Sequence, residues 1–163
     1  MKEFRIYTDG SVAWGTIQKG QKARGPGAWG FVAYPLRQPK VERYGYMPGE
    51  QTNNRAELQA IIEALDWLFR EYPEYQWDAG PVLILSDSKY LVNGCMQWVW
   101  GWKANGWYTA DKKPVKNQDQ WETIHGLLGP VTQRKHWIQI QHIPRERNEE
   151  ADAVSRMAYE GDF

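Results

Sequence analysis

The sequence predicts an α/β protein built on a mixed sheet, and three observations lead to that fold class. Three short runs of aromatic and β-branched residues come first, separated by segments rich in glycine or proline, which is typical of an antiparallel meander. An amphipathic helical pattern then leads to a continuous apolar run, typical of a strand covered on both faces. Further helical patterns and one more alternating strand follow, so the predicted order is three strands, helix, strand, helices, strand, helix.

The first predicted strand ends at an acidic residue. Residues Phe4–Gly10 alternate and stop at an Asp-Gly pair, the signature of a strand that runs into a turn, so Asp9 is expected at a strand end. The next segment, Ser11–Gly27, is rich in glycine and is expected to form an exposed loop. Its cations could contact a substrate: Lys19, Lys22 and Arg24. The second and third strands are predicted at Ala28–Tyr34 and Val41–Met47.

The first helix is predicted from about Asn53 to Arg70. Its apolar residues recur at helical spacing: Leu58, Ile61, Ile62, Leu65, Leu68 and Phe69. We expect Glu57 in the first turn, beside this apolar stripe without being part of it, so that its carboxylate can point across the edge of a sheet. A simpler role is also open, because a negative charge is favourable at the positive end of the helix dipole.

The second half of the chain begins with a buried strand at Pro81–Leu85, which runs into Asp87 between two serines. A helix is predicted after Asp87 through Met96, and another from about Gln118 to Leu128. Between these two helices, the segment Trp98–Lys116 alternates aromatic residues with Gly, Asn and Lys.

The chain ends in a predicted strand and helix. Residues His136–His142 alternate as a strand, and the helix begins at Asn148. Glu149 and Glu150 occupy its first turn, as expected after an asparagine N-cap.

Length and composition bound the class of protein. The 163 residues, of which 42% are hydrophobic and 25% charged, are of ordinary size for one domain, so we expect a single domain over 1–163. Lys and Arg total 20, as do Asp and Glu, so the net charge gives no bulk signal for nucleic acid. The one cysteine, Cys95, excludes an internal disulfide and a cysteine-based zinc site. Neither a membrane-spanning run nor a signal-peptide pattern is evident, and nothing resembles a dimer seam, so we expect a cytoplasmic monomer that does not contact membranes.

Four carboxylates lie where strands end or helices begin: Asp9, Glu57, Asp87 and Asp152. Functional groups of α/β proteins gather at the carboxyl ends of strands, so Asp9 and Asp87 meet if their strands are neighbours. Each acid also has an ordinary structural role available, as a turn former, a helix cap or a partner of the helix dipole.

A cluster of such carboxylates would require a cation. Two carboxylates ~4 Å apart repel by about 4 kcal/mol at an effective dielectric of about 20. Ligation by oxygen alone favours Mg²⁺ or Mn²⁺ over zinc, and a pair of these ions is the standard apparatus for displacement at phosphorus.

Four sequence blocks resemble the ribonuclease HI family, in the same order and over nearly the whole chain: Thr8–Ser11, Thr52–Leu58, Ser86–Ser88 and Asn148–Asp152. The resemblance implies an RNase H-like fold, whose five-stranded mixed sheet has three antiparallel and then two parallel strands and is flanked by helices. It implies a metal-dependent endonuclease that cuts the RNA strand of RNA/DNA hybrids and leaves 5′-phosphate and 3′-hydroxyl ends, using two Mg²⁺ ions, with Mn²⁺ possible.

The resemblance also assigns residues. Asp9, Glu57, Asp87 and Asp152 would be the catalytic carboxylates that bind metal. His142 stands where the family places a histidine on a mobile loop that helps water attack or product release.

Two regions would hold the hybrid according to the same resemblance. Residues 98–116 resemble the family's basic protrusion, which holds the DNA strand, since tryptophan faces stack on sugars or bases and lysines meet phosphates. The expected contacts there and just beyond are Trp102, Lys103, Trp107, Lys112, Lys113, Lys116 and Trp121. Tryptophans such as Trp98 and Trp121 can equally be core residues. Thr52, Asn53 and Asn54 would contact the backbone across the minor groove, where 2′-hydroxyls distinguish RNA from DNA.

The sequence also departs from the family pattern. Glu50 stands where related enzymes often place an arginine near a DNA phosphate, and Ala104 and Asn105 stand where richer basic runs are common. We therefore expect a weak grip on the DNA strand and a shallow salt dependence of binding.

Two other functions stay open. One is a noncatalytic module that binds hybrids, and the other is a DNA-cutting nuclease related to resolvases and integrases. A proofreading exonuclease is excluded, because its first strand needs two acids separated by one residue, whereas Asp9 is followed by Gly10 and Ser11.

Overall fold

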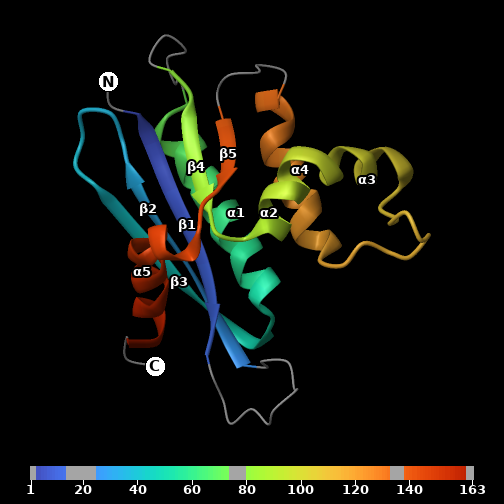
Figure 1. The fold of residues 1–163 in the computed structure, drawn as a ribbon, viewed down its shortest axis with the longest axis horizontal. Coiled ribbons are helices and arrows are strands. Elements are labelled where there is room, and N and C mark those ends of the chain that lie inside the picture. Colours follow the sequence, from blue (N-terminus) through green and yellow to red (C-terminus); the bar gives the residue numbers. More distant parts are fainter. Residues whose placement is uncertain (1–2, 14–24, 74–79, 133–137, 161–163) are drawn as a thin grey trace.

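The computed structural model describes residues 3–13, 25–73, 80–132 and 138–160, which form a five-stranded sheet with helices on both faces (Figure 1). The strand order is β3-β2-β1-β4-β5. The strands are β1 (Phe4–Val12), β2 (Gly25–Tyr34), β3 (Val41–Gln51), β4 (Val82–Ser86) and β5 (Ile138–His142). Strands β1, β2 and β3 pair antiparallel, while β4 pairs parallel with both β1 and β5. The predicted mixed sheet is therefore confirmed.

The first strand is longer than predicted. It does not stop at an Asp-Gly turn, because Asp9 pairs with Gly30 and Gly10 with Trp29 inside the β1–β2 ladder. Asp9 is thus an interior residue of a strand, and the expected turn is wrong. The predicted Ser11–Gly27 loop is shorter for the same reason, since both of its ends belong to strands. Lys19, Lys22 and Arg24, expected in this loop, lie outside the described residues.

The helices follow the predicted order with somewhat different bounds. They are α1 (Asn53–Glu71), α2 (Lys89–Asn93), α3 (Val99–Asn105), α4 (Gln118–Thr132) and α5 (Glu149–Glu160). A π-helical turn at Gly94–Trp98 joins α2 to α3, and a 3₁₀ turn at Arg145–Arg147 precedes α5. The helix predicted to end at Met96 therefore continues to Asn105. In the part of the chain that the structure describes, no helix is long and apolar enough to cross a membrane.

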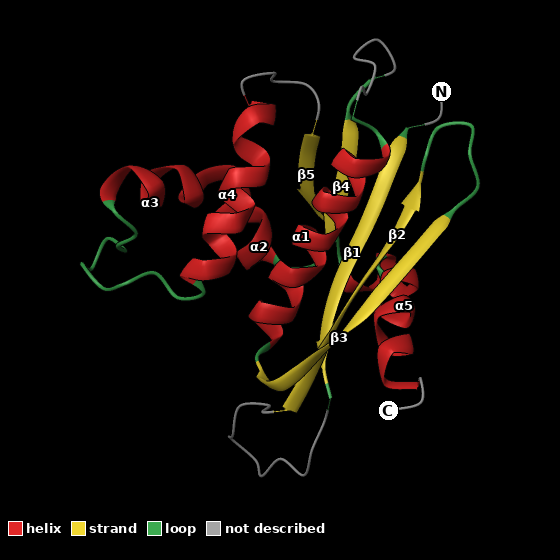
Figure 2. Ribbon diagram, turned by 180° about the vertical axis from the view of Figure 1, so that it is seen from behind, coloured by secondary structure: helices red, strands yellow, loops and turns green. Residues whose placement is uncertain are grey.

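The sheet separates two apolar layers (Figure 2). The larger layer lies between the sheet and α1, with α4 beside α1, and includes Phe4, Ile6 and Leu58. The smaller layer lies under α5 and is built from Val32, Ala151 and Val154. This division follows from strand alternation, because successive side chains of a strand point to opposite faces.

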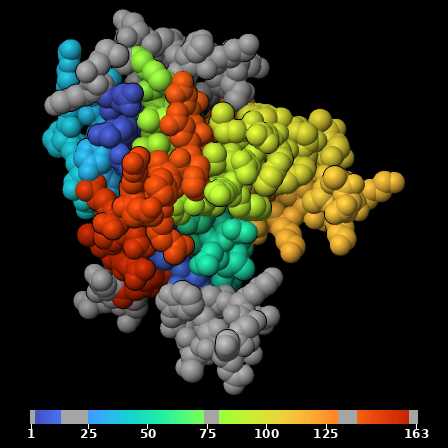
Figure 3. Space-filling model, in the orientation of Figure 1, coloured from blue at the N-terminus to red at the C-terminus, as the bar shows by residue number. Residues whose placement is uncertain are grey.

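The segment from α3 to the start of α4 projects away from the sheet (Figures 1 and 3). We call residues 98–116 the protrusion. At its base, Gly94 permits close packing of Trp121, since a Cβ on Gly94 would overlap the Trp121 ring. The π-helical turn that begins at Gly94 thus accommodates the largest fully buried side chain of the described residues.

Candidate active site

Three of the four predicted acids form a compact group, which we call the carboxylate cluster: Asp9, Glu57 and Asp87. One carboxylate oxygen from each lies within 4.8 Å of the others. The three residues come from β1, from α1 and from the segment after β4. Segments far apart in the chain therefore meet at one point of the sheet.

The register of the parallel strands explains why Asp9 and Asp87 are neighbours. Thr8 of β1 pairs with Ser86, the last residue of β4, and the next residue of the chain after each of them is an aspartate. This arrangement satisfies the condition in the sequence prediction, which required the two strands to be adjacent.

Glu57 reaches the cluster from the fifth position of α1, one residue beyond the first turn. Its side chain is 8% exposed and belongs to the buried side of the helix, so the expectation that it lies outside this side is wrong. Close contact between α1 and β1 places Glu57 beside Asp9. A Cβ on Gly10 would overlap the Ala56 carbonyl group and the Glu57 nitrogen, so only glycine allows this approach.

Asp152 occupies the first turn of α5, at the edge of the cluster. It is close enough to Asp9 for its charge to raise the pKa of Asp9. Its own carboxylate pairs with Arg156 one turn later, with 3.2 Å between Nε and Oδ2. The fourth acid is therefore partly neutralised by a neighbour on its own helix.

Burial and mutual repulsion perturb the cluster strongly. Burial, followed by the charge of Asp87, raises the pKa of Asp9 to about 8. Burial, followed by the charges of Asp9 and Asp87, raises the pKa of Glu57 well above its usual range, and a hydrogen bond from the Gly10 backbone offsets only part of this effect.

The cluster has the chemistry of a site for a hard divalent cation. Glu57 Oε2 is buried and has no hydrogen-bond partner among the described residues, which is costly for a carboxylate unless a cation binds it. All of the gathered ligand atoms are carboxylate oxygens, the type that Mg²⁺ and Mn²⁺ prefer. The residues present therefore fit the metal that the sequence predicts.

His142 is the last residue of β5 and is exposed. It pairs with Ser86, the residue before Asp87, so it lies one strand away from the cluster. This position agrees with the strand predicted to end at His142.

The beginning of α1 presents the predicted polar residues. Thr52 caps the helix, its Oγ1 accepting from the Arg55 N–H at 3.2 Å. Thr52, Asn53 and Asn54 are exposed on the helix that carries Glu57. An exposed pair of amides on the helix that contributes Glu57 to the carboxylate cluster is suited to contacts with a ligand.

The predicted contacts in the protrusion and just beyond it differ in exposure, and Trp102 is half-buried. The cations are exposed: Lys103, Lys112, Lys113 and Lys116. Trp107 and Trp121 are 7% and 0% exposed, so their predicted role as substrate contacts is wrong and both are core residues. Trp121 packs edge-on against Tyr90 and Trp102, and its Nε1 donates to Tyr90 Oη at 2.9 Å. Trp98, the other candidate core residue, is instead 39% exposed.

Sequence reasoning missed a clamp between α1 and α4. Arg55 donates to both carboxylate oxygens of Asp119 on α4, at 3.0 and 2.8 Å, and to Asn117 Oδ1 at 3.3 Å. The Gln120 side chain donates back to the Arg55 carbonyl at 2.8 Å. The clamp fixes the start of α1, and with it Glu57, relative to the base of the protrusion. The contact could not be predicted from the sequence, because Arg55 and Asp119 are far apart in the chain. The only available signal was that Arg55 lies inside one of the four blocks that resemble the family.

The strand order and the buried acidic cluster together define an α/β protein of the RNase H-like class. Comparison with known proteins agrees, since the family model for RNase H matches residues 1–160. Ribonuclease H of Cupriavidus metallidurans is 41% identical over 155 residues, which cover 95% of this chain and 94% of the relative. Ribonuclease H of Cupriavidus necator is 39% identical and covers 98% and 97%. The chain therefore belongs to the RNase H family and is an enzyme of the ribonuclease class.

Solved structures show the same fold. The crystal structure of LC11-RNase H1 in complex with RNA/DNA hybrid superposes with a TM-score of 0.65 at 25% identity, covering 97% of each chain. The foamy viral protease-reverse transcriptase in complex with RNA/DNA hybrid gives a TM-score of 0.71 at 24% identity over 95% of this chain and 20% of that one. The second similarity concerns the fold alone.

Proposed function

We propose that this enzyme is an endonuclease that hydrolyses the RNA strand of RNA/DNA hybrids and leaves 5′-phosphate and 3′-hydroxyl ends. The observation that carries the proposal is the carboxylate cluster, in which one oxygen from each of three acids lies within 4.8 Å of the others. Oε2 of Glu57 is buried and has no hydrogen-bond partner among the described residues. Family membership supports it, as does the hybrid bound to LC11-RNase H1.

Asp9, Glu57 and Asp87 would hold two Mg²⁺ ions, or Mn²⁺ ions, with Asp152 contributing from α5. Such ions supply activation of water and stabilisation of the leaving oxygen in displacements at phosphorus. The protein contributes a fixed array of oxygens. Because the pKa values of Asp9 and Glu57 are raised, these carboxyl groups hold protons in the metal-free state. Metal binding displaces these protons, so the affinity for metal increases as pH rises.

His142 would act on protons at the edge of the site. The support for this role is its exposure and its pairing with Ser86, the residue before Asp87. We assign it to assist water attack or product release, as the family resemblance implies, because an imidazole can both accept and donate a proton.

The hybrid would be held at both ends of the site. Thr52, Asn53 and Asn54 would contact the minor groove beside the RNA 2′-hydroxyls, and the exposed lysines of the protrusion would contact phosphates of the DNA strand. Trp102 retains partial exposure and would stack on a sugar or base. A monomer in the cytoplasm stays our expectation from the sequence.

The test is cleavage of end-labelled RNA/DNA hybrid, double-stranded RNA, double-stranded DNA and single-stranded RNA, with Mg²⁺ or with EDTA. We expect endonucleolytic cuts in hybrid RNA alone, lost with EDTA and reduced at least about 1000-fold in Asp9→Asn, since a metal ligand is removed. Asp66→Asn is the matched control, because Asp66 is exposed on α1 and forms an ion pair with Arg70 one turn later.

The alternative functions predict different results. Binding of hybrid without cleavage in either metal would indicate a noncatalytic binding module. Cleavage of double-stranded DNA would indicate a relative of resolvases and integrases.

A further inference from the structure

Asn148 lies beneath the site and is almost completely buried, with 1% of its surface exposed. It follows the 3₁₀ turn and directly precedes α5. Its side-chain nitrogen, Nδ2, donates to the backbone oxygen of Thr8 at 2.9 Å and to Oδ2 of Asp87 at 3.2 Å. A single amide therefore contacts both the strand that carries Asp9 and the carboxylate of Asp87.

The side chain of Asn148 does not cap the helix, although its sequence position predicts a cap. An N-cap side chain accepts a hydrogen bond from a backbone N–H two or three residues later. Asn148 Oδ1, the atom that would accept, is buried and has no hydrogen-bond partner in the part of the chain that the structure describes. An asparagine that leaves its acceptor unpaired contributes through its donor, and this donor points to Thr8 and Asp87.

The backbone of Asn148 joins the remaining parts of the site. Its N–H donates to the Arg145 carbonyl at 2.9 Å, and its carbonyl accepts from the Asp152 N–H at 3.1 Å. The residue is thus bonded to the peptide that precedes Asp9, to the carboxylate of Asp87 and to the helical turn that carries Asp152. Three of the four acids are placed relative to one another through this one residue.

We propose that Asn148 is a positioning residue that orients the Asp87 carboxylate and fixes the spacing between Asp87 and Asp9 for divalent cations. The proposal rests on the function proposed above. By holding Oδ2 of Asp87, the amide restricts rotation of the carboxylate that belongs to the cluster. Groups that orient metal-binding carboxylates in this way tune the affinity of the site.

The chemistry of the amide suits this task better than the alternatives. Aspartate has the same shape, but it would offer an acceptor and a negative charge to two existing acceptors. Serine is too short to span the distance to both partners. Lysine or arginine would donate to Asp87, but its charge would compete with the cation. A neutral donor orients the carboxylate without neutralising it.

The experiment compares Asn148→Ser with wild type and with Ser155→Ala. Serine at position 148 supports a helix N-terminus but loses both side-chain contacts with the site. Ser155 is a matched control, because it is fully buried on α5 and its Oγ donates to the Asp152 carbonyl rather than to a carboxylate. Circular dichroism and thermal unfolding first establish that each variant is folded.

The main readout is Mg²⁺ affinity measured by calorimetry without substrate, followed by cleavage of hybrid at increasing Mg²⁺ concentrations. We expect Asn148→Ser to weaken Mg²⁺ binding about 10-fold to 100-fold and to lower kcat to a similar extent at limiting metal. The KM for the hybrid should stay within a few-fold, and Ser155→Ala should keep the wild-type affinity for Mg²⁺. Wild-type affinity in folded Asn148→Ser would overturn the proposal, as would an equal loss in both variants.

A second measurement needs no substitution. In nitrogen-15 NMR spectra of the wild-type protein, the hydrogens of the Asn148 side-chain amide should exchange slowly with water. The chemical shift of this amide should change during a Mg²⁺ titration, and the midpoint of the change should agree with the Mg²⁺ affinity measured by calorimetry. An amide signal that is insensitive to Mg²⁺ would overturn the positioning role. Failure of the wild-type protein to cleave any hybrid would instead contradict the proposed function, so the two failures are distinguishable.

Discussion

The carboxylate cluster and the protrusion are assembled on opposite physical principles. The cluster buries charged groups, and two of its members, Asp9 and Glu57, are 5% and 8% exposed. The protrusion exposes its lysines and buries tryptophan rings beneath them. Charge is concentrated inside the fold in the first region and distributed over the surface in the second.

This difference shows what each region can tolerate. Like charges held in a buried cluster destabilise the metal-free fold, so the cluster depends on close contacts between distant segments and on a cation. The protrusion is stabilised by apolar packing around Trp121, and its lysines can vary without changing that core. Small displacements should therefore disable the cluster, while the protrusion should lose individual charges gradually.

The largest effect is expected from Gly10→Ala, which tests the close contact at the cluster. The added Cβ overlaps backbone atoms of Ala56 and Glu57, which cannot move alone, so the start of α1 must shift away from β1. We expect cleavage of hybrid to fall by at least about 100-fold, because a displacement of roughly 1 Å is sufficient for such a loss. Gly101→Ala is the control, since a Cβ there meets no atom within 4 Å. Wild-type activity in Gly10→Ala would show that the contact is not needed.

A comparison of Trp121→Ala with Trp98→Ala tests the division of the protrusion into core and surface. Loss of the fully buried Trp121 ring should lower the free energy of unfolding by about 3 to 5 kcal/mol. Loss of the exposed Trp98 ring should cost about 1 kcal/mol or less, and it should raise the KM for the hybrid if the ring stacks on substrate. Urea unfolding and steady-state kinetics provide the two readouts. Equal losses of stability would contradict the division.

The metal-free protein should lose stability as pH rises from about 4 to about 8. Because the pKa of Asp9 is raised from 3.8 to about 8, the folded state binds more protons than the unfolded state in this range, and stability then decreases with pH. A difference of one bound proton between the folded and unfolded states corresponds to a fall in Tm of about 3 to 5 °C per pH unit. Calorimetry in EDTA should show this slope in wild type and a smaller slope in Asp9→Asn. A slope that persists unchanged in Asp9→Asn would assign it to other groups.

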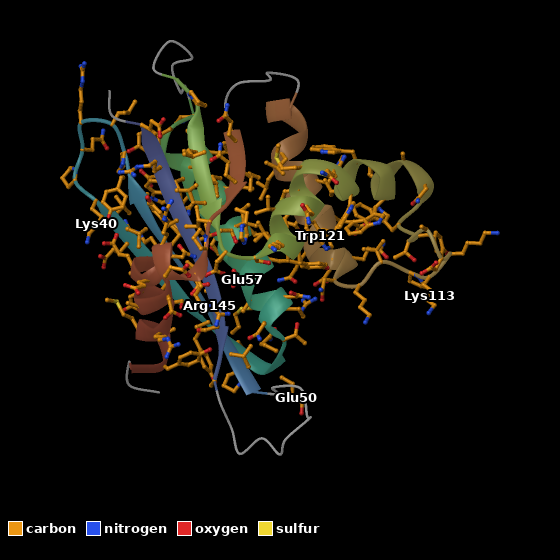
Figure 4. All side chains as sticks on the ribbon, viewed as in Figure 1. Lys40, Glu50, Glu57, Lys113, Trp121 and Arg145 are labelled. Atoms are coloured by element: carbon orange, nitrogen blue, oxygen red, sulfur yellow. The ribbon has the colours of Figure 1, made fainter. Side chains whose placement is uncertain are left out.

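The smallest effects are expected from single lysines of the protrusion. Alanine at Lys112 or Lys113 should weaken hybrid binding only a few-fold and reduce the slope of log affinity against log salt by about 0.9 for each phosphate that the lysine neutralises. The overall slope of the wild-type protein should be shallow, as the few basic residues near Asn105 indicate. Lys40→Ala is the control, because Lys40 pairs with Glu42 and lies on the opposite side of the molecule from Lys113 (Figure 4). A steep slope that implies neutralisation of six or more phosphates would contradict the expected weak grip.

Much of this protein was determined by local sequence patterns. The alternation of strands and the helical spacing after Asn53 predicted the α/β class and the order of the elements, since both periodicities are set by backbone geometry. The four acidic blocks identified the family, and the structure brings three of their acids together. The number of residues between two acids in the sequence does not give the distance between them in the fold. The cluster could therefore be predicted only from the expected positions of Asp9 and Asp87 after strands and from the resemblance to a family.

Only the tertiary structure decided how individual residues are used. Gly10 reads as a turn residue in sequence, but the approach of α1 makes it the contact that admits Glu57. Asn148 reads as a helix cap, but β1 and the Asp87 carboxylate take its donor. Trp121 and Trp98 are chemically identical, and packing against Gly94 and Tyr90 buries the first while the second stays exposed. In each case the deciding partner lies on another segment of the chain, because burial and hydrogen bonding depend on what the fold brings alongside a residue.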